Sequence, residues 1–248
     1  MQNRRGLFAG MQSGRLSGFV PYKGTKDLPN AGRISRFIRN FVDMKVALCQ
    51  FSMEWEAAAR NLRRAEELVA QAGADLALLP EMFATGFVTE PWRTALPDEE
   101  ELLAWMRRTA RRYATALAGS AVVRSGDRFA NRFFFVRPAG GAERYDKRHL
   151  FSIGGEDAHF VAGRWRVVVE YGGLRFLPLV CYDLRFPVWC RCRSDYDAIL
   201  CVASWPAPRR EVWRTLLRAR AIAIDIDGKR MVTQILRVRN ICSHRAGN

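Results

Sequence analysis

The sequence predicts an α/β protein, in which short buried strands alternate with amphipathic helices. Apolar runs of strand length occur at 45–51, 75–81 and 116–123. Between them, 54–74 and 98–116 place apolar residues three and four positions apart, which is the spacing of a helix with one buried face. With 248 residues, 49% of them hydrophobic, the chain is long enough to form one domain around a substantial core.

The first elements are expected to form a β-α-β unit. In its helix, Leu62, Ala65 and Leu68 share one face, and Gly73 is expected to end the helix because glycine adopts the left-handed conformation at no steric cost. The alternation then continues, with strands expected at 116–123, 131–138, 164–171, 174–183 and 197–205 and helices at 98–116 and 210–224. The glycine-rich, charged stretch 140–157 is interpreted as a loop.

The two ends of the chain differ from its middle. Residues 1–43 contain many glycines and no sustained periodicity, so we expect a poorly ordered basic extension, although an organellar transit peptide has a similar composition. Residues 44–222 are expected to form the folded domain, and 223–248 a basic tail. The net charge is +15, and more than half of the excess lies in these two ends. No nucleic-acid partner is therefore expected, and a nucleic-acid-binding protein is the least favoured alternative.

Other function classes lack their sequence signals. No run approaches the roughly 18 apolar residues of a membrane span, so no membrane partner is expected. The six cysteines lack C-x-x-C pairs and the three histidines lack H-x-x-x-H spacing, which argues against a metal site. No glycine-rich phosphate loop is present, so no cofactor is expected. The cysteine pattern favours a reducing, cytoplasmic compartment.

Polar residues with complementary chemistry stand where three apolar or strand-like segments end. Glu81 ends LALLPE, Lys147 follows ERYD, and Cys181 ends FLPLV. If the three converged at one edge of the sheet, the carboxylate could deprotonate the thiol and the ammonium could stabilise the oxyanion formed by thiolate attack on an amide. The backbone N–H of Tyr182 would help to bind that oxyanion. Each residue alone also has an ordinary structural explanation, such as a small buried thiol.

Longer blocks around these residues indicate a family. LLPEMFATGF, RYDKRHLFSIGGE and LVCYDLRFPVW occur in this order and resemble the signature blocks of the nitrilase, or carbon-nitrogen hydrolase, superfamily. The nearest resemblance is to its omega-amidase branch. The resemblance implies a four-layer α-β-β-α sandwich, homodimers, and hydrolysis of the terminal amide of a small ω-amido dicarboxylate such as 2-oxoglutaramate, with release of ammonia.

The resemblance also assigns roles to particular residues. It implies that Glu81 is the general base and later acid, that Lys147 stabilises the oxyanion, and that Cys181 is the nucleophile that forms a thioester. Glu156 matches a second glutamate that orients Lys147 and the substrate. Trp205 matches an aromatic wall of the pocket, although an ordinary core tryptophan would fit the same position.

The resemblance ends after Ile222. The tail departs from the family pattern and is short, so the sandwich is expected to lack its final strands, with a substitute strand from 234–241 as the alternative. Exposed sheet edges would then be an aggregation hazard. The alternatives for function are an inactive or regulatory homologue that keeps a small-molecule pocket, and a hydrolase that acts on a different small amide or a nitrile.

Overall fold

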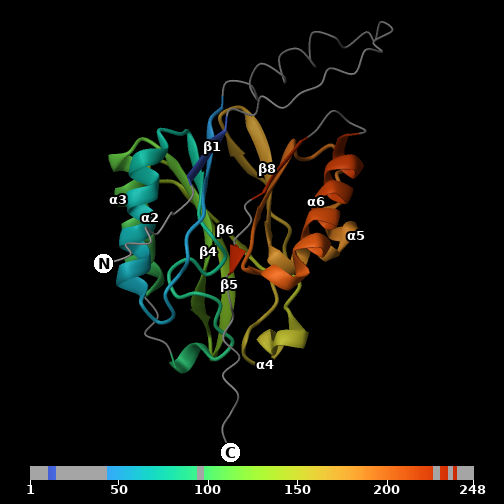
Figure 1. Cartoon of the computed structure of the whole chain (residues 1–248), viewed down its shortest axis with the longest axis horizontal. Coiled ribbons are helices and arrows are strands. Elements are labelled where there is room, and N and C mark those ends of the chain that lie inside the picture. Colours follow the sequence, from blue (N-terminus) through green and yellow to red (C-terminus); the bar gives the residue numbers. More distant parts are fainter. Residues whose placement is uncertain (1–10, 15–43, 94–97, 226–229, 234–236, 239–248) are drawn as a thin grey trace, which may run out of the picture.

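Two β-sheets pack face to face at the centre of the molecule, and helices cover both outer faces (Figure 1). The computed structural model describes residues 11–14, 44–93, 98–225, 230–233 and 237–238. The layers follow the order α-β-β-α, which confirms the predicted fold class. Within the described residues, none of the helices has the length and apolar character needed to span a membrane.

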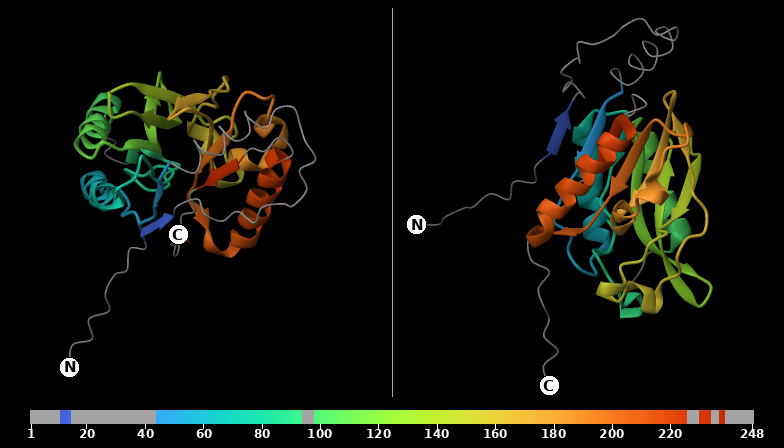
Figure 2. Two further views of the ribbon diagram at one scale, coloured as in Figure 1. Left: turned by 90° about the horizontal axis from the view of Figure 1, so that it is seen from above. Right: turned by 90° about the vertical axis from the view of Figure 1, so that its right-hand side faces the viewer.

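The first sheet has six strands in the order β1-β2-β3-β4-β5-β6. Neighbouring strands are parallel from β2 to β4 and antiparallel at β1 and from β4 to β6. The strands are β1 (Met11–Gly14), β2 (Val46–Cys49), β3 (Leu76–Leu78), β4 (Ala116–Ser125), β5 (Arg128–Val136) and β6 (Ala142–Asp146). The helices α2 (Ala58–Ala72) and α3 (Glu99–Arg112) cover its outer face (Figures 1 and 2).

The second sheet has four strands in the order β11-β9-β8-β7. Its strands are β7 (Val169–Tyr171), β8 (Leu174–Val180), β9 (Ala198–Val202) and β11 (Arg230–Thr233). The helices α5 (Pro187–Cys190) and α6 (Arg210–Asp225) lie on its outer side (Figure 1). A separate parallel pair joins β10 (Trp205–Pro206) to β12 (Arg237–Val238).

Alternating side chains of the strands build two apolar layers. In β5, Phe133 and Phe135 face the second sheet, whereas Phe134 and Val136 face α2 and α3. This period of two is the strand geometry in which successive side chains point to opposite faces. Burial on both faces explains why the central strands read as continuous apolar runs in the sequence.

The structure differs from the sequence prediction in several places. The expected strands 164–171 and 174–183 are shorter, as β7 (Val169–Tyr171) and β8 (Leu174–Val180), and Cys181 begins a 3₁₀ turn instead. Strand β6 lies inside the stretch 140–157, for which the sequence predicts a loop. The prediction is wrong because β6 is an edge strand in which only Tyr145 is buried. The sandwich is expected to lack the final strands of the family; in the part of the tail that the structure describes, β11 pairs in parallel with β9 and adds one strand to the second sheet. Of the alternative segment 234–241, the structure describes Arg237 and Val238, which form β12.

The expected boundaries of the N-terminal extension, the domain and the tail remain predictions. The structure describes only 11–14 of the first 43 residues, and these form β1 at the edge of the first sheet (Figure 2).

Candidate active site

Four buried polar side chains from separate segments meet between the two sheets. Glu81 follows β3, Lys147 follows β6, Cys181 follows β8, and Glu156 begins the short helix α4 (Glu156–His159). The charged side chains are at most 1% exposed and Cys181 is 9% exposed. Burial of charged groups is costly unless they are paired and hydrogen-bonded, so their partners are informative.

Lys147 lies between two carboxylates. Its Nζ donates to Glu81 Oε1 at 3.0 Å and to Glu156 Oε1 and Oε2 at 3.1 and 2.8 Å. The backbone N–H of Phe151 donates to Glu156 Oε2 at 2.7 Å and fixes that carboxylate. Burial acts to lower the pKa of Lys147, but the negative charges of Glu156 and Glu81 outweigh it and raise the pKa. Lys147 therefore remains an ammonium at neutral pH.

Glu81 is held from both sheets. Its Oε2 accepts the backbone N–H of Ser204 at 2.8 Å, and the Ser204 hydroxyl donates to the backbone carbonyl of Glu81 at 3.1 Å. Since Ser204 follows β9, these bonds connect the end of β3 to the second sheet. The carboxylate therefore has a fixed orientation beside Lys147 and Cys181.

Asn131, on β5, connects the two carboxylates and was not singled out from the sequence. Its Nδ2 donates to Glu81 Oε1 at 3.0 Å and to Glu156 Oε1 at 3.1 Å, and the side chain is fully buried. Its sequence context, NRFFFV, reads as an ordinary strand, so only the tertiary structure shows that the amide faces the carboxylates.

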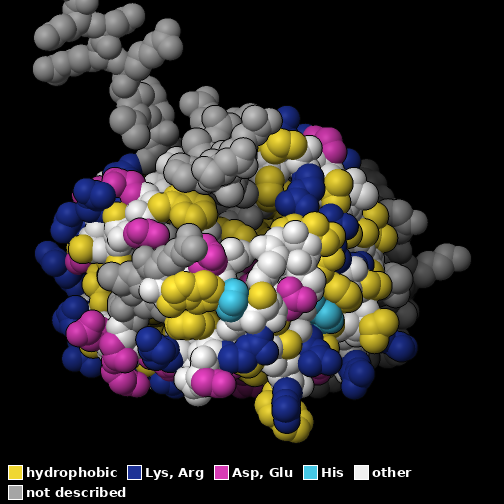
Figure 3. All heavy atoms as spheres, turned by 90° about the horizontal axis from the view of Figure 1, so that it is seen from below, with side chains coloured by type: hydrophobic (Ala, Val, Ile, Leu, Met, Phe, Trp, Pro, Cys, Tyr) yellow, Lys and Arg dark blue, Asp and Glu magenta, His cyan; other side chains and the backbone are white. Residues whose placement is uncertain are grey.

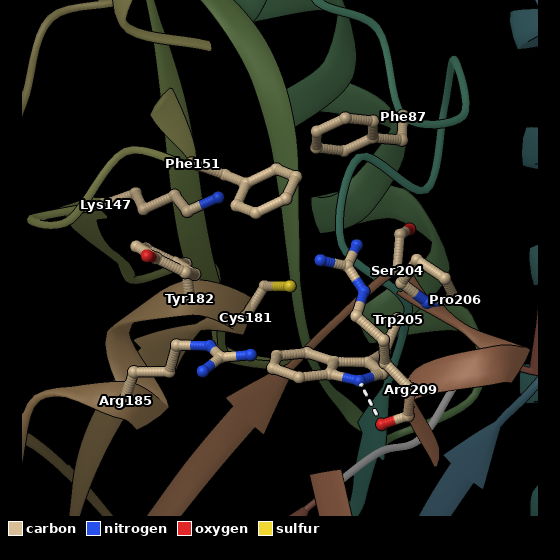
Figure 4. Close-up of a pocket in the computed structure, with 10 residues that line it drawn as sticks. All are labelled: Phe87, Lys147, Phe151, Cys181, Tyr182, Arg185, Ser204, Trp205, Pro206 and Arg209. Carbon is tan, nitrogen blue, oxygen red and sulfur yellow. Dashed lines mark hydrogen bonds between the residues drawn. The ribbon is translucent and has the colours of Figure 1, made fainter. Parts of the chain in front are cut away.

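Cys181 occupies a strained turn at the end of β8. Its φ of 47° lies in the left-handed region, which is uncommon for a residue other than glycine. It begins the 3₁₀ turn η3 (Cys181–Arg185), and its sulfur points into the pocket beside Lys147 (Figure 4). Burial raises the pKa of this thiol well above its ordinary value, Glu81 adds to the rise, and Lys147 opposes it. The resting side chain is therefore a thiol, and a base is needed to activate it.

Aromatic side chains form the walls of a pocket above Cys181 (Figure 4). The walls are made by Phe87, Phe151, Tyr182 and Trp205. Trp205 lines this pocket, and its ring also packs on that of the buried Trp213.

Two arginines add positive charge to the same pocket. Arg185 lies 5.6 Å from the Tyr182 ring centre and 5.5 Å from that of Trp205, and Arg209 lies 5.1 Å from that of Phe151. The carbonyl of Arg209 accepts the Trp205 Nε1–H at 2.8 Å. Among the residues that the structure describes, neither arginine has a carboxylate partner, and the Arg185 Nε is buried without a hydrogen bond.

The structure brings all six predicted site residues to one place. Glu81, Lys147 and Glu156 form the charged cluster, and Cys181, Tyr182 and Trp205 line the pocket next to it. Within the described ranges, no group of three or more His, Cys, Asp or Glu side chains is arranged to hold a metal ion. This constellation can carry out nucleophilic catalysis with its own side chains.

Comparison with known proteins identifies the family of this chain. Residues 45–226 match the family model described as carbon-nitrogen hydrolase. The chain belongs to the carbon-nitrogen hydrolase family. It is therefore a hydrolase, and the superfamily resemblance seen in the sequence is confirmed.

Individual members of the family share most of this chain. It is 47% identical over 180 residues to "Omega-amidase YafV" of Yersinia enterocolitica, covering 72% of this chain and 70% of that protein. It is 30% identical to "2-oxoglutaramate amidase" of Bacillus subtilis, covering 71% of each. Among solved structures, XC1258 of Xanthomonas campestris, a CN-hydrolase superfamily protein with an arsenic adduct in its active site, superposes with a TM-score of 0.70 at 38% identity. That match covers 77% of this chain and 76% of XC1258.

Proposed function

We propose that this carbon-nitrogen hydrolase cleaves the terminal amide of a small ω-amido dicarboxylate, of the kind represented by 2-oxoglutaramate, and releases ammonia. The observation that carries the proposal is the buried cluster of Glu81, Lys147 and Cys181 at the base of a cationic pocket. Relatives named omega-amidase and 2-oxoglutaramate amidase support the choice of substrate.

The first half of the reaction forms a thioester. Glu81 accepts the thiol proton as the Cys181 sulfur attacks the amide carbon, which is needed because burial and Glu81 keep the pKa of the thiol high. Negative charge then builds on the carbonyl oxygen. The Lys147 ammonium and the backbone N–H of Tyr182 stabilise it. The protonated Glu81 donates its proton to the amide nitrogen, the carbon–nitrogen bond breaks, and ammonia leaves.

The second half returns the enzyme to its starting state. Glu81 accepts a proton from a water molecule as the water oxygen attacks the thioester carbon. The carbon–sulfur bond breaks, the proton returns to the sulfur, and a dicarboxylate leaves. Throughout both halves Glu156 keeps Lys147 in place, since three hydrogen bonds of 2.7 to 3.1 Å join Glu156 to Lys147 and to the backbone of Phe151.

The charge of the pocket favours an acidic substrate. The guanidinium of Arg209 extends toward Phe151, and that of Arg185 lies beside the Trp205 ring (Figure 4). A guanidinium binds a carboxylate through paired hydrogen bonds, and the aromatic rings beside both arginines hold their planes in position. We assign to these arginines the carboxylate at the far end of the substrate.

The test is ammonia release from 2-oxoglutaramate by the purified protein, its Cys181→Ala variant and its Arg209→Gln variant. We expect release by the wild type, none by Cys181→Ala, and a KM at least about tenfold higher for Arg209→Gln because a charged hydrogen bond contributes about 1.5–3 kcal/mol. Activity on an uncharged amide should not respond to Arg209→Gln. Equal activity of Cys181→Ala and wild type would contradict the mechanism.

The homodimer and the cytoplasmic location belong to the same proposal. Val188, Val212 and Ile222 are 80%, 39% and 69% exposed on α5 and α6, which supports association through this outer layer. Cys181, Cys190 and Cys201 are thiols rather than disulfides, which supports a reducing compartment. On the face shown in Figure 3, basic, acidic and hydrophobic side chains are interspersed, which supports a small-molecule substrate rather than a nucleic acid.

A further inference from the structure

We propose that Asp183 is a positioning residue that locks the turn carrying Cys181 to the segment carrying Lys147. The inference rests on the proposed roles of these two residues. Lys147 follows β6 of the first sheet and Cys181 follows β8 of the second, so no strand ladder connects them. Their relative position therefore depends on contacts across the sandwich.

The carboxylate of Asp183 makes such contacts in both directions. It is fully buried, and it accepts the backbone N–H of Val180 at 3.0 Å and the backbone N–H of His149 at 2.9 Å. Val180 immediately precedes Cys181, and His149 lies two residues after Lys147. One carboxylate thus binds the backbone of both segments.

Two side chains from the segment that carries Lys147 also bind the Asp183 carboxylate, and we call this set of bonds to Asp183 the lock. The Tyr145 hydroxyl donates to Asp183 Oδ2 at 2.8 Å, and the His149 Nδ1 lies 2.8 Å from Oδ1. The Tyr145 oxygen also accepts the Trp189 Nε1–H at 3.0 Å and the Arg148 backbone N–H at 3.2 Å. Because both lone pairs of the phenol oxygen are used, its proton is directed to Asp183. Tyr145 and His149 flank Lys147 symmetrically, two residues on either side.

The lock matters because Cys181 is held in an unfavourable conformation. A left-handed φ of 47° is unfavourable for a residue with a Cβ atom and persists only if the surroundings enforce it. The bond from Val180 to Asp183 spans Cys181 and closes the turn around it. Loss of the lock would let Cys181 relax, and a shift of about 1 Å of the nucleophile lowers rates by about a hundredfold.

The chemistry of Asp183 is specific to a carboxylate. Three donors and the His149 Nδ1, which donates in the tautomer that carries its proton there, converge on its two oxygens. An asparagine would present an NH₂ group to one pair of these partners, and each pair includes a backbone N–H. A backbone N–H cannot rotate away from that group. Asp183→Asn is thus expected to disturb the turn even though its shape is almost unchanged.

The decisive experiment uses Tyr145→Phe, which removes one hydroxyl from the lock and retains the aromatic core. Tyr171→Phe is the matched control, because its hydroxyl donates a single bond to the Asp75 carbonyl on the exposed side of the molecule. For both variants, and for Asp183→Asn where it folds, we would measure kcat and KM for 2-oxoglutaramate and Tm. We would also measure the rate at which iodoacetamide alkylates Cys181 in the folded protein, by digesting samples after different times and quantifying the Cys181 peptide by mass spectrometry.

We expect Tyr145→Phe to lower kcat at least about tenfold with KM within about twofold, and to change the Cys181 alkylation rate by a similar factor. Tyr171→Phe should keep the wild-type kcat and alkylation rate, whether or not its Tm changes. If Tyr145→Phe only lowers Tm, and leaves both kcat and alkylation at the wild-type level, Asp183 is merely structural and the proposal is overturned. Alkylation does not depend on the substrate, so it tests the lock even if 2-oxoglutaramate is not hydrolysed.

Discussion

Asn131 shows how much of the site depends on one neutral side chain. Its amide donates to both carboxylates beside Lys147. Asn131→Ala removes both bonds, and bonds to charged groups contribute about 1.5–3 kcal/mol, so we expect kcat to fall by about 10- to 100-fold in the ammonia-release assay.

Asn61→Ala is the control for this prediction. Asn61 is also buried and bonds to Glu54 and to the Ala84 carbonyl, away from the pocket. Its loss should lower Tm as Asn131→Ala does, but kcat should not change at temperatures at which the variant is folded. Equal losses of kcat in both variants would mean that Asn131 acts only through stability.

Asp195 provides a pH-dependent contribution to stability. Burial acts to raise its pKa, but the hydrogen bonds from Arg166 and from the backbone N–H of Arg193 outweigh this and lower the pKa to about 2. A carboxyl whose pKa is lower in the folded than in the unfolded state stabilises the protein at pH values above its unfolded-state pKa. This contribution is lost as the pH falls through the folded-state pKa of about 2.

Asp195→Asn should therefore be less stable than the wild type at pH 7. Because the pair is partly exposed to solvent, the expected difference in the free energy of unfolding is at most about 1 kcal/mol. Urea unfolding at several pH values should show the difference shrinking below about pH 4. A difference that stays constant down to pH 2 would contradict the role of the charge.

At the scale of elements, the central strand β4 supports the turn that carries Glu81. The backbone N–H groups of Met82 and Phe83 donate to the Ser120 hydroxyl and carbonyl, and the N–H of Ser120 donates to the Pro80 carbonyl. Gly119 lies next to these contacts. A Cβ atom added to it would lie 2.8 Å from Leu79 Cβ and 2.9 Å from the Phe83 ring.

Gly119→Ala should consequently displace the end of β3. Overpacking of a core typically costs about 1–3 kcal/mol, so we expect a lower Tm by thermal denaturation together with a reduced kcat. Gly141→Ala is the control, because the added atom meets only the Arg137 side chain at 3.6 Å, which is an ordinary contact. Its Tm and kcat should stay close to the wild-type values.

At the scale of the whole molecule, the tail takes part in the sandwich. β11 covers the edge of β9 in parallel pairing along four residues. Deletion of 230–248 would expose the N–H and C=O groups on this edge of β9, so we expect a lower Tm and concentration-dependent light scattering. A deletion of 239–248, which keeps β11 and β12, is the control.

The sequence by itself determined the layer-forming elements and the candidate chemistry. Periodicity located α2, α3 and α6, because a helix with one buried face must repeat its apolar residues every three to four positions. Strands such as β8 and β9 stood out because burial on both faces requires continuous apolar runs. Glu81, Lys147 and Cys181 were found because each stands in a motif block at the end of a strand.

Only the tertiary structure decided which other side chains complete the site. Asn131 and Asp183 both lie in segments whose local sequence looks like a strand, and they bind residues 50 and 38 positions away. β6 escaped prediction because an edge strand buries little, and β11 because its pairing partner in β9 lies about 30 positions earlier. Local patterns record burial and backbone preference, whereas hydrogen bonds between the two sheets exist only once the sandwich has closed.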